Sequence, residues 1–184
     1  MDDRHPKGFT LVELLVALAV LAILVTQALP AMGRVLDRQR LRAAAETLAA
    51  DLRGARALAR TDPLAPALTL SFRTGAGWCY GLARRPCDCR LASPHQAAAC
   101  TLARGGQLHL RRREAAAFPG ITLQRVTFPG GRARFDPVRG LASPGTLALD
   151  NRRGERLELR LGLLGRLRIC RPAGHSAPPG YPSC

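Results

Sequence analysis

The chain has 184 residues, of which 47% are apolar and 4% aromatic, and its 28 basic and 13 acidic residues give a net charge of +15. This length restricts the chain to one domain, or a domain with an appendage, and the apolar content is enough for a core. The basic excess suggests an anionic partner, which can be nucleic acid, anionic lipid or an acidic protein; the alternative is a solvated arginine surface.

An apolar run follows a short polar leader. Residues 1–8 carry Arg4 and Lys7, and no basic residue occurs between Phe9 and Met32. As a helix this run would extend about 36 Å, enough to cross a bilayer core of about 30 Å. We therefore predict a transmembrane helical segment at residues 9–33.

Glu13 is the one acid in this run. An ordinary membrane anchor, or a secretory signal cut near Ala31, leaves Glu13 without a role, although a charge in an apolar span costs a few kcal/mol. Cleavage between Gly8 and Phe9 would create an α-amino cation at Phe9. In an assembly of such chains, that cation can neutralise Glu13 of the next subunit.

The stretch Gly8-Phe9-Thr10-Leu11-Val12-Glu13 resembles the prepilin signal of type IV pilins and of type II secretion pseudopilins. The resemblance implies that prepilin peptidase cuts after Gly8 and methylates Phe9. It implies that Glu13 serves assembly with other pilins or pseudopilins. It also places the protein in the bacterial inner membrane as a single-pass chain, with its head in the periplasm.

The helix is expected to continue through residues 34–62. One apolar stripe recurs at steps of three and four, and it consists of Leu41, Ala45, Leu48, Leu52, Ala55 and Ala59. Asp62-Pro63 then stops the helix.

Beyond Pro63 the apolar period changes to two. The alternating residues are Leu68, Leu70, Phe72, Trp78, Tyr80, Leu82, Leu108, Leu110, Ile121, Leu123, Leu147, Leu149, Leu157, Leu159, Leu161, Leu167 and Ile169. Glycine and proline separate these runs, which is typical of antiparallel strands joined by turns. The predicted fold is α+β and pilin-like: one long N-terminal helix packs on a β-rich head at residues 63–184.

The last third reads as Phe-x-Pro-x-Gly, a strand, an Arg-Gly turn, a second strand and Gly-Arg-x-Arg. This order is similar to the C-terminal region of the GspH/FimT family of minor pilins and pseudopilins. The resemblance therefore covers both ends of the chain, and the middle, roughly residues 74–130, matches the family less well.

The six cysteines all lie in the head, and in an exported chain they indicate up to three disulfides. Cys170 and Cys184 are isolated and would close the C-terminal tail into a loop. Pairing Cys79 with Cys100 would leave Cys87 and Cys89 in a tight ring, so we favour Cys79–Cys87 with Cys89–Cys100. The alternative, a zinc site of Cys87, Cys89, His95 and Cys100, does not have a standard ligand spacing.

Arginine is concentrated near the C-terminus. Arg166 and Arg168 flank Leu167 in a strand-like run, so both are expected to point away from the apolar face, and Gly165 leaves the backbone unobstructed. Two neighbouring guanidinium groups suit adjacent phosphates. A similar Gly-Arg-x-Arg element in the FimT branch is associated with DNA binding during natural transformation. Arg171, Arg152 and Arg153 complete the predicted DNA-binding set.

The same motif occurs a second time as Gly131-Arg132-Ala133-Arg134, and only its position favours the C-terminal copy. No nucleophile–base pair, phosphate loop or metal cluster occurs in the sequence, so we expect neither an enzyme nor a cofactor. The main hypothesis is a FimT-type minor pilin that binds double-stranded DNA without sequence preference. The alternatives are a structural GspH-type pseudopilin and a secreted basic protein with an ordinary signal.

Overall fold

The structure is a computed structural model that describes residues 10–62 and 64–184, and the side chains of all of these except residues 27–31. Its one α-helix in this range, α1, runs from Leu11 to Arg60. The chain divides into two compact units, Met1–Leu36 and Asp37–Cys184.

The first unit contributes the N-terminal part of α1. Thr10 caps the helix, because its hydroxyl accepts a hydrogen bond from the Glu13 N–H at 3.2 Å. Large apolar side chains from Leu11 to Val25 are exposed in the single chain. Within the described residues, no helix combines the length and the apolar character that a membrane crossing requires.

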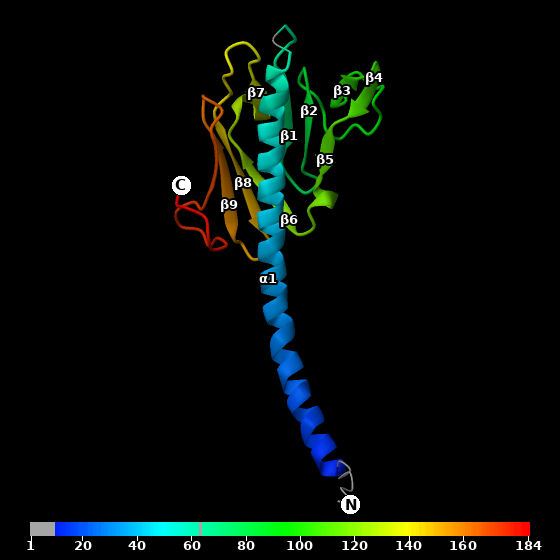
Figure 1. Ribbon diagram of the computed structural model, residues 1–184, viewed down its shortest axis with the longest axis vertical. Coiled ribbons are helices and arrows are strands. Elements are labelled where there is room, and N and C mark those ends of the chain that lie inside the picture. Colours follow the sequence, from blue (N-terminus) through cyan, green and yellow to red (C-terminus); the bar gives the residue numbers. More distant parts are fainter. Residues whose placement is uncertain (1–9, 63) are drawn as a thin grey trace, which may run out of the picture. The chain divides into compact units, whose positions relative to one another are not determined.

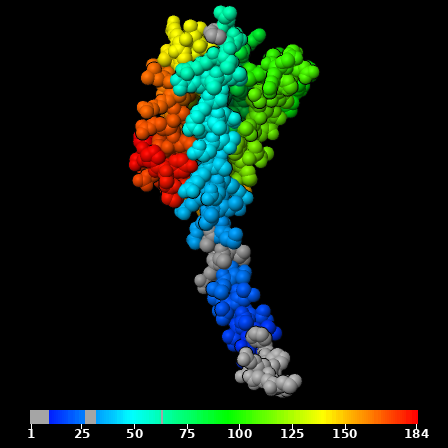
Figure 2. Space-filling view, in the orientation of Figure 1, coloured from blue at the N-terminus to red at the C-terminus, as the bar shows by residue number. Residues whose placement is uncertain are grey.

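The second unit begins with the C-terminal part of α1, which packs on the head. The six residues of the predicted stripe are all at most 1% exposed and belong to the main hydrophobic core cluster of the head. Figures 1 and 2 show this part of the helix lying between the strands of the C-terminal third and those of the middle of the chain. Spacing of apolar residues at three and four therefore produces the expected buried face.

Ten strands follow the helix, and they form three antiparallel sheets. The first sheet has the order β5-β2-β1-β7 and the second has the order β10-β9-β8-β6, while β3 and β4 form a separate hairpin. The strands are β1 (Leu68–Arg73), β2 (Cys79–Ala83), β3 (Thr101–Arg104), β4 (Gln107–Leu110), β5 (Arg112–Glu114), β6 (Ile121–Val126), β7 (Arg132–Phe135), β8 (Gly145–Asn151), β9 (Arg156–Leu161) and β10 (Leu167–Cys170).

An aromatic cluster joins the two large sheets beneath the helix. Trp78 donates its indole N–H to the Ile121 carbonyl at 2.9 Å and stacks on Phe118, whereas Phe72 stacks on Phe128. At the other end of the unit, the Ala142 N–H donates to the Leu163 carbonyl at 2.8 Å and the Ser143 N–H donates to the Arg134 carbonyl at 2.9 Å. These contacts fix the second sheet against the first.

The predicted α+β, pilin-like fold is confirmed: a long N-terminal helix packs on antiparallel sheets. The period-two pattern of apolar residues does not predict three of the strands, namely β3, β5 and β7. In β5 and β3 the alternation is hidden because their side chains are half-buried or exposed on both faces. In β7 the alternation is present, since Ala133 and Phe135 are buried between exposed arginines.

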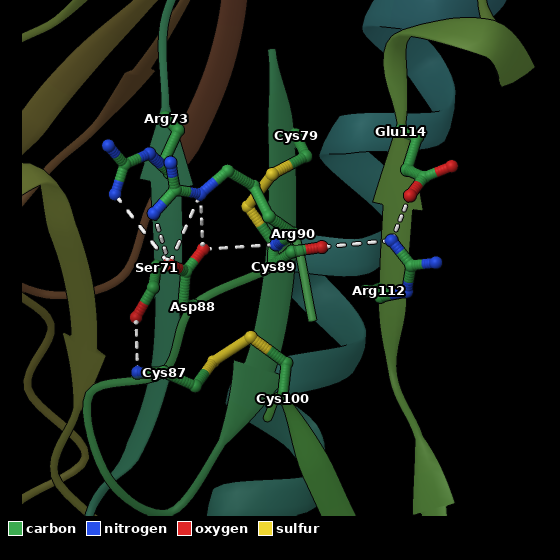
Figure 3. The surroundings of a disulfide bond; sticks show 10 residues. All are labelled: Ser71, Arg73, Cys79, Cys87, Asp88, Cys89, Arg90, Cys100, Arg112 and Glu114. Carbon is green, nitrogen blue, oxygen red and sulfur yellow. Dashed lines mark hydrogen bonds and ion pairs between the residues drawn. A yellow bond between two sulfur atoms is a disulfide. The ribbon is translucent and has the colours of Figure 1, made fainter. Parts of the chain in front are cut away.

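The predicted disulfides Cys79–Cys87 and Cys89–Cys100 are wrong. The structure pairs Cys79 with Cys89 and Cys87 with Cys100 (Figure 3), so the two disulfides interleave along the sequence. The loop after β2 folds back over the strand, and the Cys100 side chain fills the space that a Cβ at Gly81 would need. Proximity in sequence does not reveal this folding back. Cys170 and Cys184 form the third disulfide, the same pair that the sequence indicates.

Candidate nucleic-acid interface

The C-terminal Gly-Arg-x-Arg element forms the second half of the β9–β10 hairpin. The Gly162 N–H donates to the Arg166 carbonyl at 2.9 Å and closes the turn. Arg168 lies in β10 directly opposite Arg160 of β9. Arg166 and Arg168 are both exposed, as the sequence predicts.

Arginines directly opposite each other on neighbouring strands repel unless an anion compensates them. Glu158 compensates Arg160, with Nη2 to Oε2 at 2.9 Å, and also Arg125, with Nη2 to Oε1 at 2.6 Å. The Glu158 side chain is only 2% exposed, so both arginines lie over it. Among the described side chains, Arg166 and Arg168 have no ion-pair partner. An external anion would relieve the repulsion at Arg168.

Gly165 does not leave open space for a ligand, contrary to the sequence-based expectation. The Arg56 side chain of α1 occupies the position where a Cβ would project, and Gly165 has φ +71°. Arg56 donates to the Leu164 carbonyl at 2.6 Å and to the Gly165 carbonyl at 3.0 Å. The glycine of the motif therefore makes room for Arg56, which binds the hairpin turn to the helix, and only the two arginines of the motif face outward.

The other predicted DNA-binding arginines are not brought together with this pair. Arg152 and Arg153 belong to the β8–β9 turn, at the opposite end of β9 from the Gly162–Gly165 turn. Arg153 forms an ion pair with Asp37 at 2.9 Å. Arg171 is exposed directly after β10, where its N–H donates to the Pro182 carbonyl at 2.9 Å. The predicted set is thus divided between two ends of the second sheet.

The second copy of the motif lies on β7, at the edge of the first sheet. Arg132 and Arg134 are exposed, opposite Ser71 and Thr69 of β1. Neither has an ion-pair partner among the described residues. Exposure therefore does not distinguish the two copies of the motif, and position in the sequence is the only feature that favours the C-terminal copy.

Carboxylates of the head are mostly engaged with arginines, which leaves a surplus of cationic side chains. Arg90 hydrogen-bonds Asp88 and lowers the pKa of its carboxyl to about 2, with Arg73 adding a weaker attraction at 3.9 Å. Within the described part of the chain, exposed arginines outside any ion pair are Arg34, Arg53, Arg60, Arg85, Arg104, Arg111, Arg132, Arg134, Arg139, Arg152, Arg166, Arg168 and Arg171.

The three remaining site residues lie at the N-terminus. Gly8 and Phe9, the predicted processing residues, fall outside the described residues. Glu13 is exposed in the first turn of α1, three residues after its capping residue Thr10. A carboxylate at this position is favoured by the helix dipole, and the pair forms half of a capping box. Sequence reasoning missed this local role, although Thr-x-x-Glu is its signature.

A capped N-terminal helix with an apolar exposed beginning, packed farther along on antiparallel sheets, defines the pilin-like class of assembly subunits. The model of the prokaryotic N-terminal methylation motif matches residues 3–26, and that of the type II transport protein GspH matches residues 44–165. The chain therefore belongs to the type II transport protein GspH family, as the resemblance indicates. No curated protein and no solved structure matches the chain significantly.

The family assignment has several consequences. It makes the protein a minor pilin or pseudopilin, a structural subunit with a processed N-terminus in a membrane-anchored periplasmic assembly. The bounds of the GspH match, residues 44–165, include the middle region at residues 74–130. The match ends at Gly165, one residue before the outward-facing Arg166.

Proposed function

We propose that the protein is a FimT-type minor pilin of a type IV pilus, and that its head binds duplex DNA without sequence preference for uptake in natural transformation. Prepilin peptidase would process it after Gly8, and the α1 helix would anchor it in the inner membrane with the head in the periplasm. The observation that carries the DNA-binding proposal is the exposed pair of Arg166 and Arg168, of which Arg168 lies opposite Arg160. Neither arginine of the pair has an acidic partner among the described side chains.

Backbone phosphates are the anions that this surface suits. Two guanidinium groups on one strand can each contact a phosphate oxygen. Of the described aromatic rings of the head, Phe72, Trp78, Tyr80, Phe118, Phe128 and Phe135 are buried in its interior. Tyr181 is partly buried against the core, so few rings are available for base stacking. Binding through phosphates alone is indifferent to sequence and strongly dependent on salt.

The test measures binding of the full chain in detergent to a fluorescently labelled duplex over a series of salt concentrations. In R166Q/R168Q the affinity falls for every duplex sequence alike, and the slope of log affinity against log salt shrinks by roughly two, at about 0.9 per phosphate contact. R53Q/R104Q is the matched control, because both arginines are exposed, lack ion pairs among the described residues and lie on other elements. Equal losses in both variants would mean that general basicity is responsible.

A structural GspH-type pseudopilin of a type II secretion system is the second candidate. The observation that favours it is the end of the family match at Gly165, which leaves Arg166 and Arg168 outside the match. Gly165 itself makes room for the Arg56 side chain, which is a structural role. In this case the arginines contact neighbouring subunits, and the full chain binds no duplex even at low salt.

A further inference from the structure

A cleft opens where the two large sheets separate. Pairing between β7 and β1 ends at Arg132 opposite Ser71. Beyond this point a hollow of about 490 Å³ is lined by residues 72–74 of β1 and its continuation, and by residues 124–126 of β6. An adjoining hollow of about 320 Å³ reaches the disulfide-braced loop, and the two share Phe72, Arg73 and Gly131. We call these two hollows the inter-sheet cleft.

Three arginines from three different strands line this cleft: Arg73 of β1, Arg125 of β6 and Arg132 of β7. The side chains of Arg73 and Arg125 are 51% and 56% exposed. Arg73 reaches Asp88 only at 3.9 Å, since Arg90 holds that carboxylate at 2.7 Å (Figure 3). Arg132 has no ion-pair partner among the described residues. The cleft is therefore cationic, and Asp88 is the acid on its wall.

Bare backbone forms the wall between these arginines. Gly130 and Gly131 have φ values of +59° and +70°, which disfavour any other residue. A Cβ at Gly131 would also lie 3.4 Å from the Phe72 carbonyl oxygen. Without side chains here, a phosphate group can come close to the backbone and to the guanidinium groups together.

We propose that the inter-sheet cleft is a second phosphate-binding site, which contacts the same duplex as Arg166 and Arg168; this inference rests on the proposed function. Arg168 and Arg125 lie on the two edge strands of the second sheet, and the row Cys170, Glu158, Ala148 and Arg125 connects those strands. Three interstrand spacings of about 4.8 Å across the sheet, combined with two residues of about 3.4 Å each along a strand, place the Cα atoms of Arg168 and Arg125 about 16 Å apart. A duplex carries one phosphate per about 1.7 Å of its axis, so a short length reaches both places.

The arginines of the two sites are connected through Glu158. This buried carboxylate holds Arg160, opposite Arg168, and Arg125, at the cleft. One acid thus fixes the position of two guanidinium groups, that of Arg160 beside Arg168 and that of Arg125 at the cleft. Arginines held in place lose less freedom when they contact a phosphate.

The experiment uses the full chain in detergent and the same labelled duplex. R73Q/R132Q is expected to lower the affinity and to reduce the salt slope by roughly two, at about 0.9 per contact, whereas R53Q/R104Q keeps the wild-type slope. R73K/R132K retains both charges and keeps most of the slope. Circular dichroism checks that each variant is folded.

Asp88→Asn supplies a test in the opposite direction. Removal of the acid from the cleft wall is expected to raise the affinity several-fold at low salt, a gain that loss of folding cannot produce. Unchanged affinity in both D88N and R73Q/R132Q overturns the second site. In that case R166Q/R168Q still decides whether the C-terminal pair binds DNA, and wild-type protein that binds no duplex refutes the proposed function itself.

Discussion

At the scale of single residues, Gly165 makes room for a contact between the hairpin turn and the helix. Its left-handed backbone and missing Cβ admit the Arg56 side chain, which donates to two carbonyl groups of the turn. The sequence identifies the glycine and the flanking arginines, but the partner is 109 residues away along the chain. Such a contact follows from packing of the helix on the hairpin, which no local pattern reports.

We predict that Gly165→Ala lowers the free energy of unfolding by about 1–3 kcal/mol, because alanine is strained at this φ and displaces Arg56. Gly162→Ala, in the same turn, is the control: its Cβ would meet only the Arg166 carbonyl at 3.7 Å, so its effect stays below about 1 kcal/mol. Denaturant unfolding of both variants measures the difference. Equal effects would show that Arg56 does not depend on the glycine.

Asp88 gives a prediction for acid pH. Its folded pKa of about 2 lies below the usual carboxyl value near 3.9, because Arg90 stabilises the ionised form. A depressed pKa means that the stabilisation is present at neutral pH and is lost as the pH falls from about 4 to about 2. The melting temperature of wild type should therefore exceed that of Asp88→Asn at pH 7, and the gap should close over this range. A gap at pH 2 as large as the gap at pH 7 would contradict this account.

At the scale of elements, sequence patterns predict the structure where one face is buried. The helix stripe and most strands follow their periods of 3.6 and two, since burial of one face imposes those periods. Strand β7 has the same alternation, but its exposed positions are the arginines of the second Gly-Arg-x-Arg motif, so the sequence indicates the motif rather than the strand. No local sequence pattern predicts the interleaved disulfides, because the loop that carries them folds over the outer face of β2.

The C-terminal tail is an element held by three kinds of contact. Its disulfide joins Cys170 to Cys184, the Arg42 side chain of α1 donates to the Pro179 carbonyl at 2.6 Å, and Tyr181 packs against the core. The tail thus links the edge of the second sheet to the helix.

We predict that C170S/C184S lowers the free energy of unfolding by about 3 kcal/mol, the value expected for a loop of about 15 residues. The amides of Arg171 and Cys184 should also exchange hydrogen faster, because they donate to the Pro182 and Arg171 carbonyls across the loop that the disulfide closes. Denaturant unfolding and amide hydrogen exchange check both effects. Arg42→Ala is a milder companion variant, with a loss of about 1 kcal/mol from one hydrogen bond. If these amides stayed as protected from exchange in C170S/C184S as in wild type, the contacts with the helix would suffice to hold the tail.

At the scale of the whole molecule, the N-terminus decides how the chain is used. We predict that the mature protein begins at N-methylated Phe9, because Gly8-Phe9 stands four residues before Glu13 and the methylation motif matches residues 3–26. Mass spectrometry of protein extracted from membranes measures the mature mass. A mature chain that starts near Met32 would indicate an ordinary secretory signal and would refute assembly through Glu13.

Glu13 itself has two physical roles that a pair of substitutions can separate. Its backbone N–H is capped by Thr10, and its carboxylate lies at the positive end of the helix. In an assembly, the same carboxylate can pair with the α-amino group of a neighbouring subunit.

We predict that Glu13→Gln is processed, because the cut between Gly8 and Phe9 leaves residue 13 unchanged, and that it keeps the helix cap, because glutamine also serves in a capping box. It should enter filaments poorly, since it cannot neutralise the neighbouring cation. Glu13→Ala should show the same loss of assembly with some loss of helix stability in addition. Quantifying each variant in sheared filaments, relative to its amount in membranes, measures incorporation. If Glu13→Gln assembled like wild type and only Glu13→Ala failed, the carboxylate would act through the helix cap, and the ion pair between subunits would have no part in assembly.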